Sequence, residues 1–311
     1  MLLPMKLQLK LAKILEDVKP SKLKSVQKNL TERYRTKSGS GKSLIETESD
    51  SILYALSRMP ATFSVNLTLL DTLREQGFIT NIKTAFDVGS GTGAGYFALS
   101  EFDKDIKVTL FERDKNMISI FNRFDTGKKV QKFDLVCDNF DEKADLVVSS
   151  YVLSELSDEN RITAAKKLFN AAEKYLLLID TGTPKVWKQM MKLKTELEKI
   201  GGFIVAPCMS GVCGLENDYC QFYARVERSS VHRIIKEATL SYEDEKYFYL
   251  LITKQPHCQN AKFRIIRRPF INSNVTTLML CGENGVEQKD YTKRNKEEYK
   301  KAKKAKINGL I

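Results

Sequence analysis

Asp87-Val88-Gly89-Ser90-Gly91-Thr92-Gly93 follows the short apolar run Thr84-Ala85-Phe86. An apolar run that ends in an acidic residue and opens into a glycine-rich turn is typical of a β-strand whose carboxyl end contacts a nucleotide. The glycines allow the backbone to turn tightly and to approach a ligand without interference from a Cβ atom. Their spacing is G-x-G-x-G, which differs from the G-x-G-x-x-G of dinucleotide-binding enzymes. The stretch therefore predicts a nucleotide-type ligand at residues 87–93.

Strand-like and helix-like runs alternate after this turn, which indicates β-α-β units and a parallel sheet. We expect strands at 84–88, 107–111, 132–137, 145–150 and 175–180. We expect helices at about 93–101, 114–121 and 160–173, and one more that Pro184 opens and Gly201-Gly202 closes. Beyond residue 203 the pattern loosens, with strand-like runs at 247–253, 262–266 and 275–280.

The first 80 residues have the pattern of a basic helical region. Apolar residues three or four positions apart predict a helix within 6–36; they are Leu7, Leu11, Leu15 and Val18. Ser38-Gly39-Ser40-Gly41 breaks this pattern, and Pro60 divides a second helical block at about 49–76 into two helices. We divide the chain into a helical basic region (1–80), an α/β core (81–202), a cysteine-rich metal-binding segment that completes the sheet (203–285) and a basic tail (286–311).

Composition limits the class of protein and its partners. The chain of 311 residues has a net charge of +12 and is 42% hydrophobic. No apolar run approaches the roughly 20 residues that span a bilayer, and the first 20 residues contain no Arg but do contain Glu16 and Asp17. We therefore expect no membrane partner and a cytoplasmic protein, with the mitochondrial matrix as the alternative. The positive charge, dense between Lys289 and Lys306, favours a nucleic-acid partner over a merely basic protein.

The G-x-G-x-G turn resembles the first motif of class I S-adenosylmethionine (SAM) methyltransferases, which have an α/β Rossmann-like fold. In such a fold an acid at the end of the second strand binds the ribose hydroxyls, and Glu112 stands there. Asp138 would face the adenine amino group and Asp87 the methionine amino group. Together with Gly89, Gly91 and Gly93 these acids predict a SAM site; the alternative is a degenerate, empty pocket.

No catalytic residue can be assigned. The Asn/Asp-Pro-Pro-aromatic signature of amino-group methyltransferases is absent, and Ser149-Ser150-Tyr151-Val152-Leu153-Ser154-Glu155-Leu156 stands in its place. Tyr151 or Glu155 would assist a proton transfer, or would line a wall or cap a helix. Cys137 falls in an apolar strand pattern, which favours a buried core residue over a nucleophile.

Three of the six cysteines lie close together in sequence. Cys208, Cys213 and Cys220 have the spacing C-x4-C-x6-C in a polar segment. Three neighbouring thiols suggest a soft metal, and Cys281 or Cys258 would supply a fourth ligand. The spacing fits neither a zinc ribbon nor a ferredoxin, so free thiols are the alternative.

Six stretches in this order resemble the methyltransferase-like proteins of small-ribosomal-subunit assembly, the family of mitochondrial Rsm-type proteins and their bacterial relatives. Besides Asp87–Gly93 and Ser149–Leu156 they are Ile179-Asp180-Thr181-Gly182-Thr183-Pro184, Val205-Ala206-Pro207-Cys208, Tyr219-Cys220-Gln221-Phe222-Tyr223-Ala224-Arg225 and Tyr242-Glu243-Asp244-Glu245-Lys246-Tyr247. Ser57-Arg58-Met59-Pro60-Ala61-Thr62 also resembles the bacterial members.

The resemblance implies a monomeric factor that binds small-subunit rRNA in the precursor particle, with SAM bound and methyl transfer in doubt; an active rRNA methyltransferase is the alternative. It implies that Cys208, Cys213, Cys220 and Cys281 hold a four-iron, four-sulfide cluster (4Fe–4S), with zinc as the alternative. We expect the cluster to shape an RNA-facing surface that includes Arg225, Arg228, Arg233, Arg264, Arg267 and Arg268. The chain departs from the family at Met209-Ser210, Gly214 and Asp180.

Overall fold

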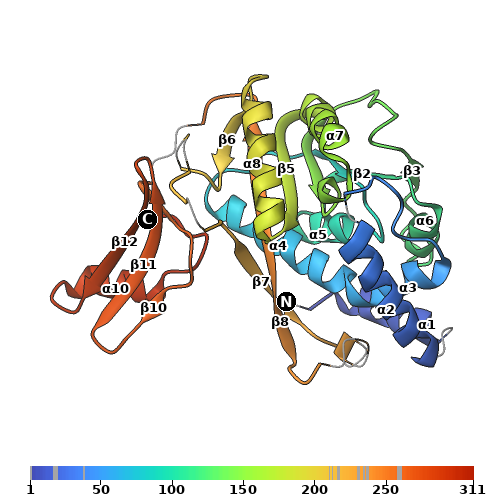
Figure 1. The fold of residues 1–311 in the computed structure, drawn as a ribbon, viewed down its shortest axis with the longest axis horizontal. Coiled ribbons are helices and arrows are strands. Elements are labelled where there is room, and N and C mark those ends of the chain that lie inside the picture. Colours follow the sequence, from blue (N-terminus) through green and yellow to red (C-terminus); the bar gives the residue numbers. More distant parts are fainter. Residues whose placement is uncertain are drawn as a thin grey trace.

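A mostly parallel β-sheet with helices on both faces forms the centre of the protein (Figure 1). The structure is a computed structural model that describes residues 2–16, 20–37, 39–209, 211, 213–215, 218–229, 232, 233, 235, 238–257 and 261–311. Val18 and Cys258, which the sequence analysis singles out, therefore lie outside the described residues. In the part of the chain that is described, no helix is long and apolar enough to cross a membrane.

The central sheet has the strand order β3-β2-β1-β4-β5-β8-β6, and β7 pairs with the long strand β8. Neighbours from β3 to β5 run parallel, whereas β8 is antiparallel to β5, β6 and β7. This order, with one antiparallel strand near the end of a parallel sheet, defines a class I SAM-methyltransferase-like fold. The strands are β1 (Thr84–Val88), β2 (Lys107–Glu112), β3 (Val130–Lys132), β4 (Ala144–Ser150), β5 (Ala172–Thr181), β6 (Phe203–Ala206), β7 (Phe222–Glu227) and β8 (Tyr242–Thr253).

The strands between the two helical layers are apolar because both of their faces are covered. Leu146, Val147 and Val148 in β4 and Leu176 to Leu178 in β5 are fully buried. α5 (Ala94–Phe102) packs with the N-terminal α4 on one face, and α7 (Asp158–Ala171) packs with α8 (Pro184–Glu198) on the other. α6 (Lys115–Asn122) follows β2, and a short 3₁₀ turn, η1 (Leu153–Glu155), follows β4.

Four helices precede the sheet: α1 (Met5–Glu16), α2 (Pro20–Lys37), α3 (Glu48–Ser57) and α4 (Met59–Glu75). Thr47 and Asp50 form a reciprocal capping box that fixes the start of α3. Pro60 stands in the first turn of α4, where its missing N–H costs nothing, so the expected division into two helices is confirmed. α1, α2 and α3 lie near α6 at one side of the molecule, whereas α4 packs against α5 and β7 (Figure 1).

A second, four-stranded antiparallel sheet projects from the β6 side of the core (Figure 1). It contains β9 (Phe263–Ile265), β10 (Phe270–Ile271), β11 (Val275–Gly282) and β12 (Gly285–Thr292), and α10 (Lys296–Lys304) packs on it. The chain end is part of this unit, because the Ile311 N–H donates to the Phe263 carbonyl at 2.9 Å and the Phe263 N–H donates to Ile311 at 3.0 Å.

Two expectations from the sequence are wrong. The strand expected at 132–137 ends at Lys132, and a turn follows because the Asp134 carboxylate and carbonyl accept the backbone N–H groups of Val136 and Cys137. Cys137 is consequently exposed rather than part of the core. The segment 286–311, expected as a solvated tail, is folded into β12 and α10 because Tyr299 and Ala302 bury the inner face of α10.

Candidate cofactor site

The glycine-rich turn at the end of β1 has the backbone conformation that its sequence demands. Gly89, Gly91 and Gly93 have φ values of 72°, 53° and 83°, which disfavour any residue with a Cβ atom. A Cβ atom on Gly89 would overlap a methyl group of Val152. The N–H groups of Gly89 and Ser90 donate to the Phe111 carbonyl at 2.8 and 3.0 Å. The turn is thereby fixed across the ends of two parallel strands.

Glu112, at the end of β2, lies in the wall of the pocket below this turn. One of its carboxylate oxygens accepts the Gly91 N–H at 2.7 Å and the other accepts the Asp114 N–H at 2.8 Å. Burial raises the pKa of the carboxyl group, and these backbone donors oppose that shift. Each oxygen keeps a lone pair for a hydroxyl donor, which is the role expected of this residue.

Asp87 is not among the residues that line this pocket, and its contact with the methionine amino group of SAM stays a prediction. Its carboxylate accepts the Tyr96 N–H at 2.8 Å, and a Cβ atom on Gly95 would come within 2.5 Å of it. Burial, with a further contribution from the charge of Glu112, raises the pKa of Asp87 to about 7. Asp87 therefore attaches the first turn of α5 to the end of β1. Gly89 and Gly91 line the pocket, whereas Gly93 packs against the ring of Phe121.

Asp138 is the other predicted acid that does not line this pocket. It is exposed, and its carboxylate accepts the Asp134 N–H at 2.7 Å. The pocket wall after β3 is instead formed by Phe133, Asp134, Leu135 and Val136. Asp134 was not predicted as a site residue because the strand was expected to extend to Cys137. The signal that could have found it is an acidic residue shortly after the end of β3.

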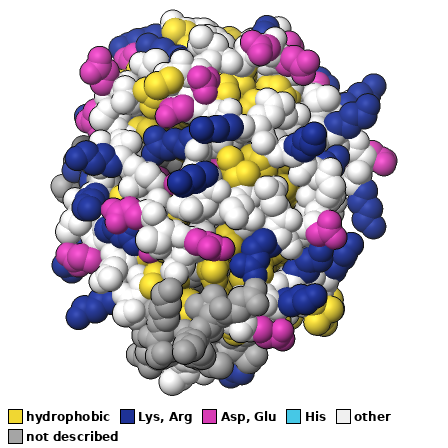
Figure 2. All heavy atoms as spheres, turned by 90° about the vertical axis from the view of Figure 1, so that its right-hand side faces the viewer, with side chains coloured by type: hydrophobic (Ala, Val, Ile, Leu, Met, Phe, Trp, Pro, Cys, Tyr) yellow, Lys and Arg dark blue, Asp and Glu magenta, His cyan; other side chains and the backbone are white. Residues whose placement is uncertain are grey.

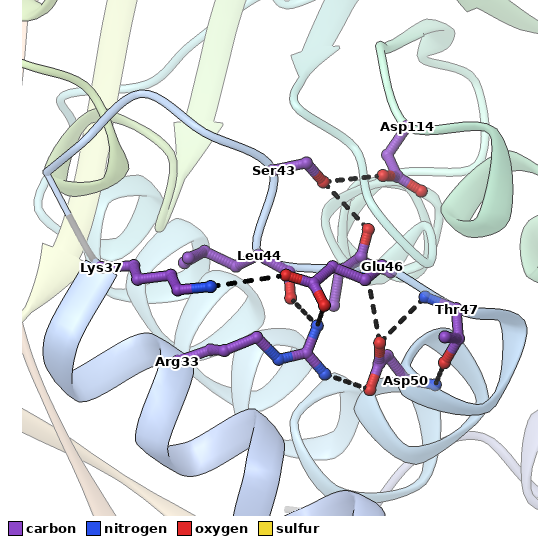
Figure 3. A network of polar contacts seen from close by, with 9 residues as sticks. Arg33, Lys37, Ser43, Leu44, Glu46, Thr47, Asp50 and Asp114 are labelled. Carbon is purple, nitrogen blue, oxygen red and sulfur yellow. Dashed lines mark hydrogen bonds and ion pairs between the residues drawn. The ribbon is translucent and has the colours of Figure 1, made fainter.

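The loop between α2 and α3 covers the pocket, and a polar network holds it there (Figure 3). Arg33 of α2 donates to the Leu44 carbonyl at 2.8 Å and pairs with Asp50, which also accepts the Thr47 N–H at 2.9 Å. Across the pocket, the Ser43 hydroxyl donates to Asp114 at 3.0 Å. Leu44 and Ile45 therefore face the cofactor pocket as a fixed cover.

The segment after β4 lies between this pocket and a larger neighbouring cavity. Tyr151 and Glu155 line both. Burial, with the charge of Asp180 next in size, raises the pKa of Glu155 to about 8. Asp180, at the end of β5, accepts the Ser154 N–H at 3.0 Å and the Thr181 N–H at 2.7 Å, which fixes the turn that carries Glu155.

The cysteines singled out by sequence lie together although they come from distant parts of the chain. Cys208, Cys213, Cys220 and Cys281 all line one small pocket between α8, β6 and β11. Burial raises the pKa of Cys208 to about 12 and raises those of Cys220 and Cys281. Within the described ranges, no three His, Cys, Asp or Glu side chains are arranged to hold a metal ion.

Most of the arginines expected to face RNA are either buried or already paired with acidic side chains. Arg264 is fully buried, donates to the Pro207 carbonyl at 2.9 Å and to Asn308 Oδ1 at 2.8 Å, and therefore cannot contact RNA. Four others pair with acids: Arg225 and Arg268 with Asp244, Arg228 with Glu243, and Arg267 with Asp218. Arg233 is exposed.

Positive charge is distributed differently on two parts of the surface. Figure 2 shows that Lys and Arg are mixed with Asp and Glu on the side where α1, α3 and α6 lie. Residues 261–311, by contrast, carry thirteen Lys and Arg and five Asp and Glu, which is +8 of the chain's +12. Eleven of these cations are exposed. Nine of the eleven lie between residues 289 and 306, where the structure gives them no acidic partner among the described residues: Lys289, Lys293, Arg294, Lys296, Lys300, Lys301, Lys303, Lys304 and Lys306.

Topology gives the class of this fold, and a comparison with known protein families gives its family. The sheet and the pocket at its carboxyl edge define a class I methyltransferase-like protein. Residues 48–308 match the family described as mitochondrial small ribosomal subunit Rsm22. The chain therefore belongs to the Rsm22 family, and the resemblance seen in its sequence motifs is confirmed. A search of curated protein sequences gives no significant match.

Solved methyltransferase structures have a distantly similar fold. Magnesium protoporphyrin IX methyltransferase of Synechocystis PCC 6803, with bound SAM, is 14% identical with a TM-score of 0.41, over 72% of this chain and 91% of that one. Mitomycin 7-O-methyltransferase is 17% identical with a TM-score of 0.46, over 74% and 67%. The N-methyltransferase NodS of Bradyrhizobium japonicum, with bound S-adenosylhomocysteine, is 12% identical with a TM-score of 0.41, over 62% and 86%.

Proposed function

We propose that this protein binds small-subunit rRNA in the precursor particle and assists assembly of the small ribosomal subunit as a monomer, with SAM and a metal centre as bound groups. The observation that carries the proposal is the extent of the family match. Residues 48–308 include the glycine-rich turn, all four converging cysteines and most of the basic C-terminal unit. We place the protein in the cytoplasm or, in a eukaryote, in the mitochondrial matrix.

The residues at the end of β1 and β2 fit SAM. Gly91 leaves room for a ligand close to the backbone, Gly89 also lines the pocket, and the Glu112 carboxylate lies in the wall with lone pairs for two ribose hydroxyls. Asp134 and Leu135, rather than Asp138, stand where an adenine edge would be recognised. When bound, SAM would supply an electrophilic methyl group; the chain supplies the cradle and the cover at Leu44 and Ile45.

Four cysteines line one pocket and supply the donor type of a thiolate-bound metal centre, although in the described residues of this structure no three of them are arranged to hold an ion. Four sulfur donors around one pocket are the ligand set of a 4Fe–4S cluster or of a structural zinc ion. Cys281 comes from β11 and the other three from the segment between β6 and β7. A centre there would join the small sheet to the core, and its binding energy would add to the folding energy of this region.

The C-terminal unit is the surface best suited to RNA. Its exposed Lys and Arg side chains, from β12 and α10, have no acidic partner in the described residues, so they are available to neutralise phosphates. The arginines of β7 and of the segment after β9 are already paired with acids and contribute less.

An active rRNA methyltransferase is the second candidate. The specific observation in its favour is that Tyr151 and Glu155 lie in the wall shared by the cofactor pocket and the neighbouring cavity. A base in that cavity would be next to the cofactor, and a carboxyl group with a pKa of about 8 is able to exchange a proton near neutral pH.

The test is crosslinking to rRNA in cells with mapping of the crosslinked sites, in a deletion strain complemented by wild type or by Gly91→Arg. We expect crosslinks to small-subunit rRNA and co-purification with its precursor particle. If Gly91→Arg restores assembly completely, SAM binding is dispensable. If the deletion strain lacks an rRNA methyl group that wild type restores and Gly91→Arg does not, the protein is an active rRNA methyltransferase. Absence of any small-subunit association would overturn the proposal.

A further inference from the structure

A cavity of about 570 Å³ lies beside the cofactor pocket, at the carboxyl ends of β4 and β5. Its volume is within the range of about 300–1,000 Å³ that is usual for small-molecule sites. The described chain closes it with α2 and α3 on one side and with η1 and the start of α8 on the other. α2 precedes residues 48–308, the segment that matches the family.

Three tyrosine rings form much of the wall, from Tyr34, Tyr54 and Tyr151. The first two are stacked, with ring centroids 6.3 Å apart and planes at 29°. Aromatic walls of this kind suit a flat ring, and unstacked bases of RNA are recognised by stacking on such side chains.

Two buried polar atoms in the wall have no hydrogen-bond partner among the described residues. They are the Tyr151 hydroxyl and the side-chain oxygen of Gln189, and the Tyr151 side chain is more than nine-tenths buried. Tyr151 also has a φ of 61°, a conformation that non-glycine residues seldom adopt and that tends to persist at ligand sites. Buried polar groups are normally paired, so a ligand that offers both an acceptor and a donor would complete this wall.

Among the described residues that line the cavity, the cations able to contact a ligand lie at its rim. In the wall, the Arg58 guanidinium forms an ion pair with Glu245 at 2.8 Å. The Asp180 carboxylate accepts hydrogen bonds from backbone N–H groups. Lys185 and Arg35 line the cavity with exposed side chains; Arg35 has only an exposed partner, Glu32, at 3.0 Å. Exposed ion pairs are weak, so both cations are able to contact a phosphate.

From these features we infer that the cavity binds one nucleotide, with its base among the tyrosine rings, its polar edge on Tyr151 and Gln189, and its phosphate at Arg35 and Lys185. The inference rests on the proposed function if the nucleotide belongs to rRNA. A free mononucleotide has the same chemistry, and the experiment distinguishes the two sources.

The experiment uses the full chain with two kinds of probe. Calorimetry measures binding of the four nucleoside monophosphates, and a single-stranded RNA carrying one 4-thiouridine is crosslinked and mapped on the protein. Tyr151→Phe removes only a hydroxyl group that has no hydrogen-bond partner among the described residues, so we expect the fold to stay intact. We expect it to weaken nucleotide binding by about 2- to 10-fold, the effect of one hydrogen bond. Tyr175→Phe, at the opposite end of β5, is the matched control.

Crosslinks to the peptides of Tyr54 or Tyr151, with weaker binding by Tyr151→Phe alone, are the expected result and assign the nucleotide to RNA. If the monophosphates bind and respond to Tyr151→Phe but RNA does not bind, the cavity holds a free nucleotide and the proposed rRNA role fails. If the RNA binds but does not crosslink to residues of the cavity, and Tyr151→Phe binds both probes as tightly as wild type, the inference fails and the proposed rRNA role stands. No binding by either probe overturns both.

Discussion

Glu245 of β8 holds the Arg58 guanidinium through two hydrogen bonds, at 2.8 and 3.3 Å, although 187 residues separate them. Each belongs to a stretch that the sequence resemblance depends on, Ser57–Thr62 and Tyr242–Tyr247. The guanidinium also lies 5.7 Å from the centre of the Tyr151 ring. This ion pair joins the N-terminal helices to the antiparallel strand at the wall of the larger cavity.

The Arg58–Glu245 pair should stabilise the fold measurably because it is bidentate and only partly exposed. We expect Glu245→Gln and Arg58→Met each to lower the free energy of unfolding, with a coupling of about 1–2 kcal/mol in a double-mutant cycle. Urea denaturation measures it. The exposed pair Lys143–Glu173, 3.7 Å apart, is the control and should give less than about 0.5 kcal/mol. Equal couplings would contradict this role.

Gly89→Ala should abolish SAM binding and destabilise the protein. The substitution strains a residue with φ of 72° and places a methyl group against Val152. Gly127→Ala is the matched control, because Gly127 has φ of 71° but no atom within 4 Å of the added Cβ. We expect about 1 kcal/mol of destabilisation for the control and at least about twice that for Gly89→Ala. Val152→Ala should partly rescue Gly89→Ala; equal effects at the two glycines would exclude the overlap as the cause.

Burial of Asp87 should make stability fall as the pH rises. The pKa of Asp87 is about 7 in the folded protein, against an ordinary value of 3.8 for an aspartate. Between these two pH values the unfolded chain has released a proton that the folded chain retains. Unfolding then releases a proton, and stability declines from about pH 4 to 7, by at most about 4 kcal/mol. Asp87→Asn keeps an oxygen for the Tyr96 N–H and should flatten this slope in urea titrations. Glu155→Gln should flatten the slope up to about pH 8, and unchanged slopes would refute the assignment.

Binding of RNA should depend on the lysines of α10. We expect the triple substitution Lys300→Gln, Lys301→Gln, Lys304→Gln to reduce the slope of log K against log salt by up to about 2, because each phosphate contact contributes about 0.7–0.9. Lys83, Lys104 and Lys107, at the amino ends of β1 and β2, form a control set with the same change of charge. Substitution is preferable to removal of 289–311, which would take away half of β12 and all of α10. The same slope in both triple variants would exclude α10 as the RNA contact.

Anaerobic purification should yield protein with about four iron and four sulfide per chain. Cys208→Ser should lose them and lower the free energy of unfolding by at least about 2 kcal/mol, since a metal centre at this pocket would join the small sheet to the core. Cys137→Ser, at an exposed cysteine outside the pocket, should retain both. If the purified protein contains zinc but no sulfide, the site is a zinc site and not a cluster. If it contains no metal, the four cysteines are free thiols.

The elements that local sequence specifies were predicted well. β1, β4, β5 and α7 begin and end within a few residues of the expected bounds, because their apolar runs and the cap at Ser157 are signals within a single segment. The position of Glu112 followed from the length of one β-α-β unit. The end of β3 was missed because Phe133-Asp134-Leu135-Val136 looks like a strand until the turn made by Asp134 is known.

The larger cavity was beyond sequence analysis. Its wall is formed by α2, α3, η1, α8 and β8, which local patterns cannot bring together. The burial of Arg264 was missed for the same reason, since its partners Pro207 and Asn308 are 57 and 44 residues away. The folding of segment 286–311 was not predicted because its nine exposed cations dominate the sequence pattern. Only two apolar residues, Tyr299 and Ala302, attach α10 to the small sheet.

The position of β8 has a consequence for synthesis on the ribosome. Until residues 247–253 have emerged, β5 has no neighbour on one side and β6 has none at all, so the apolar edge at Leu176 and Leu178 is open to solvent or to chaperones. The small sheet is completed later, because β9 pairs with β11 along one edge and with Gly309 and Ile311 along the other. A nascent chain can therefore form the cofactor pocket well before the small sheet that carries Cys281 is complete, and metal insertion into the finished site would follow translation.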